Sequence, residues 1–344
     1  MRLGIIGLPQ SGKSTVFDAL TRSVASPGHR AEDRIATIRV PDPRVDALSA
    51  MYAPKKTTFA QVEYFLPGSQ AARPDAPRDQ QFWTPVRDCD ALVLVIRNFT
   101  GLDGAAPSPA EDVTGIHQEL IISDQIVVEK RMERIAQEKQ RGRKTSEEEL
   151  ALLVRCLELL EQERPIRSDP ELPGAKALKG FAFLTAKPLL VLFNNTDDDD
   201  TTPSLPEIIT ADEAMVIRGK LEQELAQMTA EEALEFLSEF GVTESAMDRV
   251  IRRSYQRLGL ISFFTVGDDE VKAWTIAGGT PAVEAAGVIH SDIQKGFIRA
   301  EVVAYDDLMA AGSHAEARKQ AKVRLEGKTY AVQDGDFINY RFNV

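Results

Sequence analysis

The sequence has 344 residues, a formal net charge of −12 and 43% hydrophobic residues. A chain of this length exceeds one ordinary compact core, so we expect a globular protein of two or three domains. The acidic balance works against broad binding to a nucleic-acid backbone, because such binding needs clustered Lys and Arg. Residues 1–8 are too short for a signal peptide, and no apolar run reaches the roughly 18 residues of a membrane helix, so we expect a cytoplasmic protein without membrane contact.

The first predicted elements flank a phosphate-binding motif. Residues 3–6 form an apolar run that ends at Gly7, and residues 15–20 have helical spacing, which predicts a strand, a loop and a helix. Residues 7–14 read Gly-Leu-Pro-Gln-Ser-Gly-Lys-Ser and contain every fixed position of the P-loop pattern. A chance match to a turn is the alternative, and the strand and helix context disfavours it.

The residue types of this loop suit a nucleotide triphosphate. Gly7 and Gly12 let the backbone N–H groups and the helix N-terminus converge on the β-phosphate. We expect Lys13, the catalytic cation, to bridge β- and γ-phosphate oxygens, while the Ser14 hydroxyl ligates Mg²⁺ and Thr15 lies near the α-phosphate. The predicted phosphate-loop contacts are Gly7, Pro9, Gln10, Ser11, Gly12, Lys13, Ser14 and Thr15.

Two later apolar runs predict further strands of the same sheet. Residues 91–96 and 189–193 are continuous apolar runs, each followed by a polar loop, which is typical of buried parallel strands. The first domain is therefore predicted to be a doubly wound α/β fold. Cys89 precedes the first run, where we expect a small buried thiol, and neither it nor Cys156 has metal-ligand spacing.

A helical insertion is predicted between these two strands. Its apolar residues recur at helical or heptad spacing, which favours a hairpin of two paired helices. One seam contains Leu150, Leu153, Leu157 and Leu160, and the other contains Ile121, Val128 and Ile135. Ser146 and Glu149 have the spacing of a capping box that starts the second helix.

The turn of this hairpin is basic on an acidic chain. It contains Lys139, Arg141, Arg143 and Lys144. A solvated turn is the ordinary interpretation of such a short charge run, and a contact with RNA or the ribosome is the alternative.

A different pattern begins near Gly259. Short β-rich runs alternate with Gly-containing turns from there to the end, as in a small α+β domain. The runs are residues 261–266, 273–276, 297–303 and 337–342. We predict a P-loop domain in two parts, 1–116 and 169–258, around a hairpin at 117–168, followed by a C-terminal domain at 259–344.

Motifs along nearly the whole chain resemble those of the YchF or Obg-like ATPase family. Besides the P-loop, they are Val40-Pro41-Asp42-Pro43-Arg44, Lys272-Ala273-Trp274-Thr275-Ile276, His290-Ser291-Asp292, Lys295-Gly296-Phe297-Ile298-Arg299-Ala300, Asp334-Gly335-Asp336 and Phe342-Asn343-Val344. The resemblance implies a translation-factor-class P-loop domain, a coiled-coil-like insertion and a C-terminal TGS-type domain with a ubiquitin-like fold. It also implies contacts of the TGS-type domain with RNA or regulatory partners.

The resemblance further implies a base-binding motif after the strand at 189–193. Asn194-Asn195-Thr196-Asp197 stands where the superfamily has Asn-Lys-X-Asp, and Arg218 with Gly219 stands at the second base-contacting loop. The family usually ends this motif in Glu and prefers ATP, whereas Asp197 is the residue that guanine recognition uses, so ATP and GTP both stay open.

The hydrolytic machinery looks reduced. The family's Asp-X-X-Gly loop corresponds to residues 65–68, Phe-Leu-Pro-Gly, and Glu63 is either a substitute carboxylate acting through water or a solvated strand residue. The first switch, residues 29–36, is short, and residues 69–79 replace the glycine-rich second switch. We predict a nucleotide switch with slow hydrolysis that acts in translation; the alternative is a scaffold that binds nucleotide and RNA or protein partners without turnover.

Overall fold

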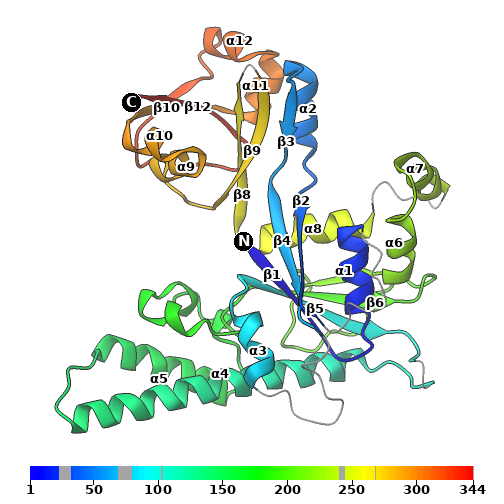
Figure 1. Cartoon of the computed structure of the whole chain (residues 1–344), viewed down its shortest axis with the longest axis vertical. Helices are drawn as coiled ribbons and strands as arrows, with labels where there is room; N and C mark the ends of the chain where they lie inside the picture. The colour runs from blue at the N-terminus through cyan, green and yellow to red at the C-terminus, as the bar shows by residue number, and fades with distance from the viewer. Residues whose placement is uncertain (23–31, 69–79, 102–103, 240–244, 268, 344) are drawn as a thin grey trace. The chain divides into compact units, whose positions relative to one another are not determined.

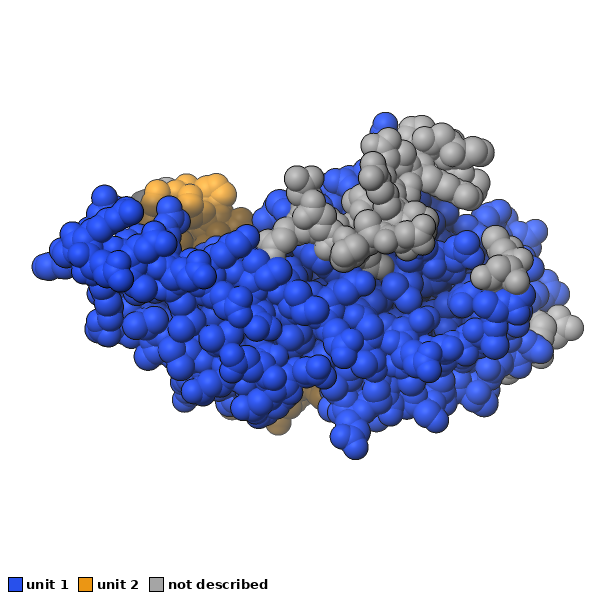
Figure 2. All heavy atoms as spheres, turned by 90° about the horizontal axis from the view of Figure 1, so that it is seen from below, with its two compact units in different colours: residues 1–37, 63–250 blue, residues 38–62, 251–344 orange. Residues whose placement is uncertain are grey.

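The computed structural model describes residues 1–22, 32–68, 80–101, 104–239, 245–267 and 269–343. The chain folds into two compact units, the first formed by residues 1–37 and 63–250 and the second by residues 38–62 and 251–344 (Figure 2). None of the helices within the described ranges is long and apolar enough to cross a membrane.

A six-stranded sheet in the order β2-β4-β1-β5-β6-β7 organises the first unit (Figure 1). Five neighbouring strands, from β4 to β7 in that order, run parallel. This pairing confirms the parallel strands predicted from the apolar runs. The strands are β1 (Arg2–Ile6), β2 (Arg34–Arg39), β4 (Gln61–Leu66), β5 (Ala91–Asn98), β6 (Leu189–Asn195) and β7 (Ala214–Ile217).

Helices cover both faces of this sheet, which confirms the doubly wound α/β fold. On one face, Leu94 and Val191 pack with Trp83 of α3 and Ile116 of α4, whereas α1 and α6 lie on the other face (Figure 1). The helices up to residue 257 are α1 (Lys13–Thr21), α3 (Gln80–Arg87), α4 (Pro109–Gln140), α5 (Glu147–Glu161), α6 (Gly219–Leu225), α7 (Ala230–Glu239) and α8 (Ala246–Arg257), with 3-10 turns η3 (Ile166–Ser168), η4 (Leu172–Gly174) and η5 (Lys176–Phe181).

Helices α4 and α5 form the predicted hairpin. Both predicted seams contribute to one apolar cluster, in which Val128 and Leu153 are fully buried. Only one of the two hydrogen bonds of the predicted capping box is present in the structure. The Glu149 N–H donates to the Ser146 hydroxyl at 3.1 Å, but the Glu149 carboxylate accepts from Arg131 of α4 at 2.7 Å instead of returning to Ser146. The side chain that was expected to cap α5 thus joins the two helices.

A buried carboxylate fixes the hairpin to the sheet domain. Asp124 of α4 has 0% exposure and accepts a hydrogen bond from Arg87 of α3 at 2.8 Å. It also accepts from the backbone N–H groups of Leu184 at 3.1 Å and Thr185 at 2.7 Å, and from the Thr185 hydroxyl at 2.8 Å. One side chain therefore holds together α3, α4 and the segment before β6.

The second unit is built on another six-stranded sheet, in the order β11-β10-β12-β8-β9-β3. Phe297, Phe263 and Tyr340 lie in its core, and the partly buried Trp274 packs against the same cluster. Its strands are β3 (Lys56–Thr58), β8 (Leu260–Val266), β9 (Glu270–Ala277), β10 (Phe297–Ala304), β11 (Arg324–Glu326) and β12 (Asp336–Phe342). Its helices are α2 (Pro43–Tyr52), α9 (Ala282–Ile289), α10 (Ser291–Lys295), α11 (Tyr305–Ala311) and α12 (His314–Lys319).

An early segment of the chain completes this second unit. Strand β3 pairs in parallel with β9, and Arg44 of α2 forms ion pairs with Asp42 and Asp334 at 2.8 Å each. These contacts explain why residues 38–62 belong to the same unit as the C-terminal residues. The predicted domains follow the order of the chain and do not include this grouping. The predicted boundaries 1–116, 117–168, 169–258 and 259–344 stay a prediction.

Candidate nucleotide-binding site

The loop between β1 and α1 wraps so tightly that two of its positions accept only glycine. A Cβ atom added at Gly7 would lie 2.4 Å from the Val95 carbonyl oxygen, and one added at Gly12 would lie 2.1 Å from Nδ2 of Asn194. Gly12 also has a φ of 93°, and the non-glycine Gln10 has a φ of 62°. The loop therefore has the curvature that aims backbone N–H groups at a phosphate.

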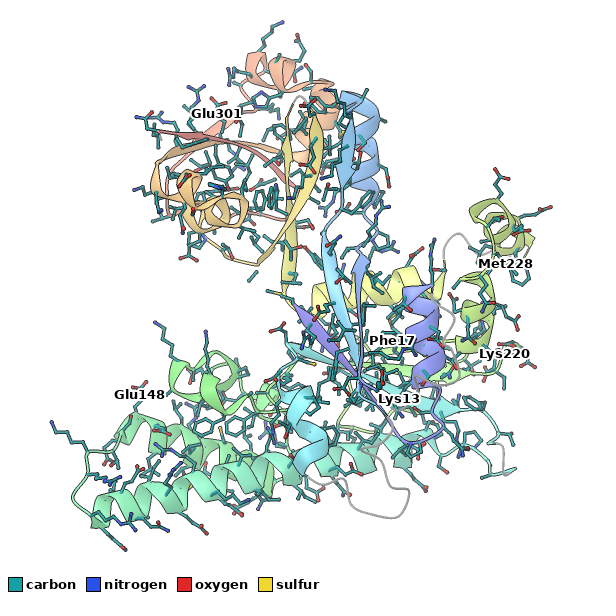
Figure 3. The ribbon with its side chains drawn as sticks, viewed as in Figure 1. Lys13, Phe17, Glu148, Lys220, Met228 and Glu301 are labelled. Carbon is teal, nitrogen blue, oxygen red and sulfur yellow. The ribbon has the colours of Figure 1, made fainter. Side chains whose placement is uncertain are left out.

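The polar side chains of this loop lie at the start of α1, where Figure 3 shows Lys13. The Lys13 ammonium donates a hydrogen bond to the Leu8 carbonyl at 2.5 Å, which folds the cation back over the loop. Ser14 is exposed, so its hydroxyl is accessible to a metal ion. Ser11 is 1% exposed, and its hydroxyl has no hydrogen-bond partner within the described part of the chain.

Asn194 clamps the phosphate loop to the loop before α6. Its carboxamide nitrogen donates to the Ser11 carbonyl at 3.2 Å, and its carboxamide oxygen accepts from the Gly219 N–H at 2.9 Å. A Cβ atom added at Gly219 would meet that oxygen at 2.7 Å. Asn194 thus positions both loops, a role that its place in a base-binding motif did not predict; its direct contact with a base stays a prediction.

Asp197 and Asn195 point in different directions. The Asp197 carboxylate is exposed and accepts from the Leu221 N–H of α6 at 3.2 Å, and the Arg218 guanidinium donates to the Asp197 carbonyl at 3.5 Å. Asn195 is buried, where its carboxamide accepts from Asn98 at 2.9 Å. Only Asp197 is therefore placed to meet a base on the outside of the loop, and this contact stays a prediction.

The structure excludes Glu63 as a substitute for the missing metal-binding carboxylate. Glu63 lies opposite Arg2 in the parallel pairing of β1 and β4, and the two side chains form an ion pair. Arg2 begins β1, four residues before Ile6 at its other end, so Glu63 lies about 13 Å from the phosphate loop at the rise of a strand. It is a partly exposed strand residue, with its side chain 30% exposed and paired with Arg2, and it lies too far from the loop to be a metal ligand there.

The rest of the reduced hydrolytic machinery is only partly within the described residues. Phe65 stands where the family pattern has Asp, and its ring is buried in the core of the sheet domain. The predictions on residues 69–79 lie outside the described residues, as does the start of the first switch, residues 29–31. The side chain at position 65 therefore packs in the hydrophobic core and supplies no metal-binding carboxylate.

Together, the doubly wound sheet and the glycine-constrained loop with Lys13 at the start of α1 define a P-loop nucleotide-binding protein.

Comparison with known proteins specifies the family. The family model YchF-GTPase_C, described as a protein of unknown function (DUF933), matches residues 260–343. The "Ribosome-binding ATPase YchF" of Bacillus subtilis is 38% identical over 365 residues, covering 99% of both chains, and that of Escherichia coli O157:H7 is 35% identical over 361 residues, covering 100% of this chain and 99% of the relative. The solved Schizosaccharomyces pombe YchF GTPase superposes with a TM-score of 0.86 at 31% identity, covering 99% of this chain and 97% of that one. The chain belongs to the YchF family, as the sequence motifs indicated.

Proposed function

We propose that this protein is a magnesium-dependent purine nucleotide switch with slow hydrolysis that binds the ribosome. The observation that carries the proposal is the phosphate loop, in which Gly7 and Gly12 are sterically required and Lys13 stands at the start of α1. The full-length similarity to relatives named ribosome-binding ATPases supports the ribosomal part.

The loop residues divide the work on the phosphates. Lys13 leaves the Leu8 carbonyl and places its charge between the β- and γ-phosphates, while the N–H groups around Gly12 bind the β-phosphate. Mg²⁺ fits this site, because the exposed Ser14 hydroxyl lies at the start of α1, directly after Lys13 of the phosphate loop. When bound, the metal neutralises charge on the phosphates. Within the described ranges no three acidic, His or Cys side chains form a metal cluster, and Mg²⁺ held largely by nucleotide phosphates needs none.

The base is proposed to lie between the loop that follows β6 and the loop before α6. Asp197 lines this position from the first loop, and Arg218 and Gly219 line it from the second. The choice between adenine and guanine depends on Asp197, because a carboxylate accepts both N–H groups of guanine and has no matching pair on adenine.

Slow turnover is proposed because the sheet supplies no acidic side chain at Phe65. Glu63 is paired with Arg2 near the other end of their strands, away from the phosphate loop. A nucleotide that is hydrolysed slowly keeps the protein in one state for long, which suits a switch.

The hairpin tip is the proposed ribosome contact. Arg141, Arg143 and Lys144 are exposed, whereas Lys139 is paired with Glu147 at 2.8 Å. Lys and Arg slightly outnumber Asp and Glu in the second unit, although the whole chain has a net charge of −12, so this TGS-type unit is a second candidate for an RNA contact. These roles require a cytoplasmic location.

The test combines binding, turnover and ribosome association. Fluorescent ATP and GTP analogues are titrated with Mg²⁺, using Lys13→Ala and, as a matched control, the exposed Lys130→Ala on the hairpin. Loss of binding in Lys13→Ala alone supports the proposal, and no binding by the unchanged protein contradicts it. Phosphate release at saturating nucleotide then separates slow hydrolysis from the non-hydrolysing scaffold.

Co-sedimentation with ribosomes tests the hairpin tip. The double variant Arg141→Glu and Arg143→Glu should lose ribosome binding, while Arg134→Glu on the shaft, 74% exposed, should keep it. Equal binding by both variants would move the contact away from the tip.

A further inference from the structure

Asp33 places a carboxylate at the phosphate end of the first unit. It directly precedes β2, and one of its carboxylate oxygens accepts a hydrogen bond from the Gly68 N–H at 2.8 Å. Gly68 follows β4, so the contact joins the segments that precede and follow these two strands. The Asp33 side chain has no other hydrogen bond or ion pair to the described residues.

The strand register places this contact beside the phosphate loop. Arg2 lies opposite Glu63 and Gly4 lies opposite Phe65 in the parallel pairing of β1 and β4. The same offset, continued past the strand ends, places Gly68 opposite Gly7, at a spacing of about 5 Å between neighbouring strands. Strand β4 lies between β2 and β1, so Gly68 separates the Asp33 carboxylate from the first glycine of the loop, and the two are about two strand spacings, roughly 10 Å, apart.

Two other described carboxylates of the first unit, Glu63 and Asp18, are already engaged. Glu63 is paired with Arg2 at the far edge of the sheet. Asp18 of α1 is 5% exposed and accepts from Arg34 at 2.5 Å and from Gln223 at 3.3 Å. Asp33 is exposed, and among the described residues its carboxylate accepts from a single backbone N–H through one of its two oxygens.

We propose that Asp33 is the carboxylate that positions the nucleotide-bound Mg²⁺ in this protein, in place of the acidic residue that Phe65 replaces. The inference rests on the proposed function. Its charge has two consequences: it attracts the hydrated metal, and without metal it repels the terminal phosphate. Triphosphate binding should consequently depend on Mg²⁺ more strongly than diphosphate binding does.

The test measures nucleotide affinity with Mg²⁺ and with EDTA. Fluorescent ATP and ADP analogues are titrated into the unchanged protein, Asp33→Asn and the control Glu32→Gln, a neighbouring exposed acid with no described hydrogen bond. Asp33→Asn keeps an acceptor for the Gly68 N–H and removes only the charge. A second readout is the affinity of the protein–ATP complex for Mn²⁺, measured by electron paramagnetic resonance.

In Asp33→Asn, the gain in ATP affinity on adding Mg²⁺ should shrink about tenfold, and Mn²⁺ binding should weaken by a similar factor, as for other residues that orient a metal. Affinity in EDTA should stay equal or rise, and Glu32→Gln should behave like the unchanged protein. The proposal is overturned if Asp33→Asn keeps the full Mg²⁺ gain, or if it tightens ATP equally with and without metal, because Asp33 would then only compete with the phosphate. Absence of nucleotide binding in the unchanged protein would instead refute the proposed function.

Discussion

Replacing Asp124 by alanine should destabilise the first unit by about 3–5 kcal/mol, the usual cost of removing one partner of a buried ion pair. The carboxylate is completely buried and accepts four hydrogen bonds. Its loss leaves the Arg87 guanidinium, 15% exposed, without its counter-charge. It also leaves the N–H groups of Leu184 and Thr185 without an acceptor, and each unsatisfied buried group costs about 1–3 kcal/mol.

Urea unfolding measures this effect with an intrinsic probe. Trp83 is 1% exposed on α3, four residues before Arg87, so its fluorescence reports on this region. Trp274 belongs to the second unit, and Trp274→Phe removes its signal. The control is Glu133→Ala, which removes an exposed carboxylate from the same helix.

The companion variants separate the charge from the hydrogen bonds. Arg87→Met removes the guanidinium, and the double variant with Asp124→Ala should cost less than the sum of the single changes, since neither charge is left unpaired. A loss below about 1 kcal/mol for Asp124→Ala, the range of an exposed ion pair, would refute the reasoning.

Three further changes probe the same unit. Gln10→Asn should raise the free energy of unfolding by about 1 kcal/mol, because Asn adopts the φ of 62° at this position more readily than Gln does. Urea unfolding measures the change, with Gln125→Asn as the control. Asn194→Ala should weaken ATP binding at least about tenfold, because the phosphate loop loses its link to Gly219 and a buried N–H loses its acceptor; retained affinity in a binding titration would contradict the clamp. Burial lowers the pKa of His117 below its ordinary value, so the unfolded chain binds more protons as pH falls through about 6.5, and stability is present above that pH and declines below it. His117→Gln should flatten this decline in pH-dependent urea unfolding.

Local patterns in the sequence were sufficient for most of the fold and for the phosphate loop. The loop was recognisable because its residues are consecutive and its strand and helix are adjacent, so their geometry is set by short-range contacts. The hairpin was predictable for the same reason, since its two seams, one containing Val128 and the other Leu153, follow from helical or heptad periodicity alone. The second sheet was predicted in four of its strands, while β3 and β11, three residues each, are too short for a periodic signal.

Only the tertiary structure decided which residues surround the phosphate end. The strand register moved Glu63 to the far edge of the sheet and brought Asp33 to Gly68, and a register cannot be read from the period-two pattern of one strand. The motif predicted that Asn194 contacts the base, but not that it links the phosphate loop to the loop before α6. That link requires Gly12 and Gly219, which are distant in sequence, because a Cβ atom at either position would collide with the Asn194 side chain. Residues 38–62 joined the second unit for a similar reason. Strand β9, which pairs with β3, and Asp334, which pairs with Arg44, lie more than two hundred residues away, and pairing at that separation leaves no local pattern in the sequence.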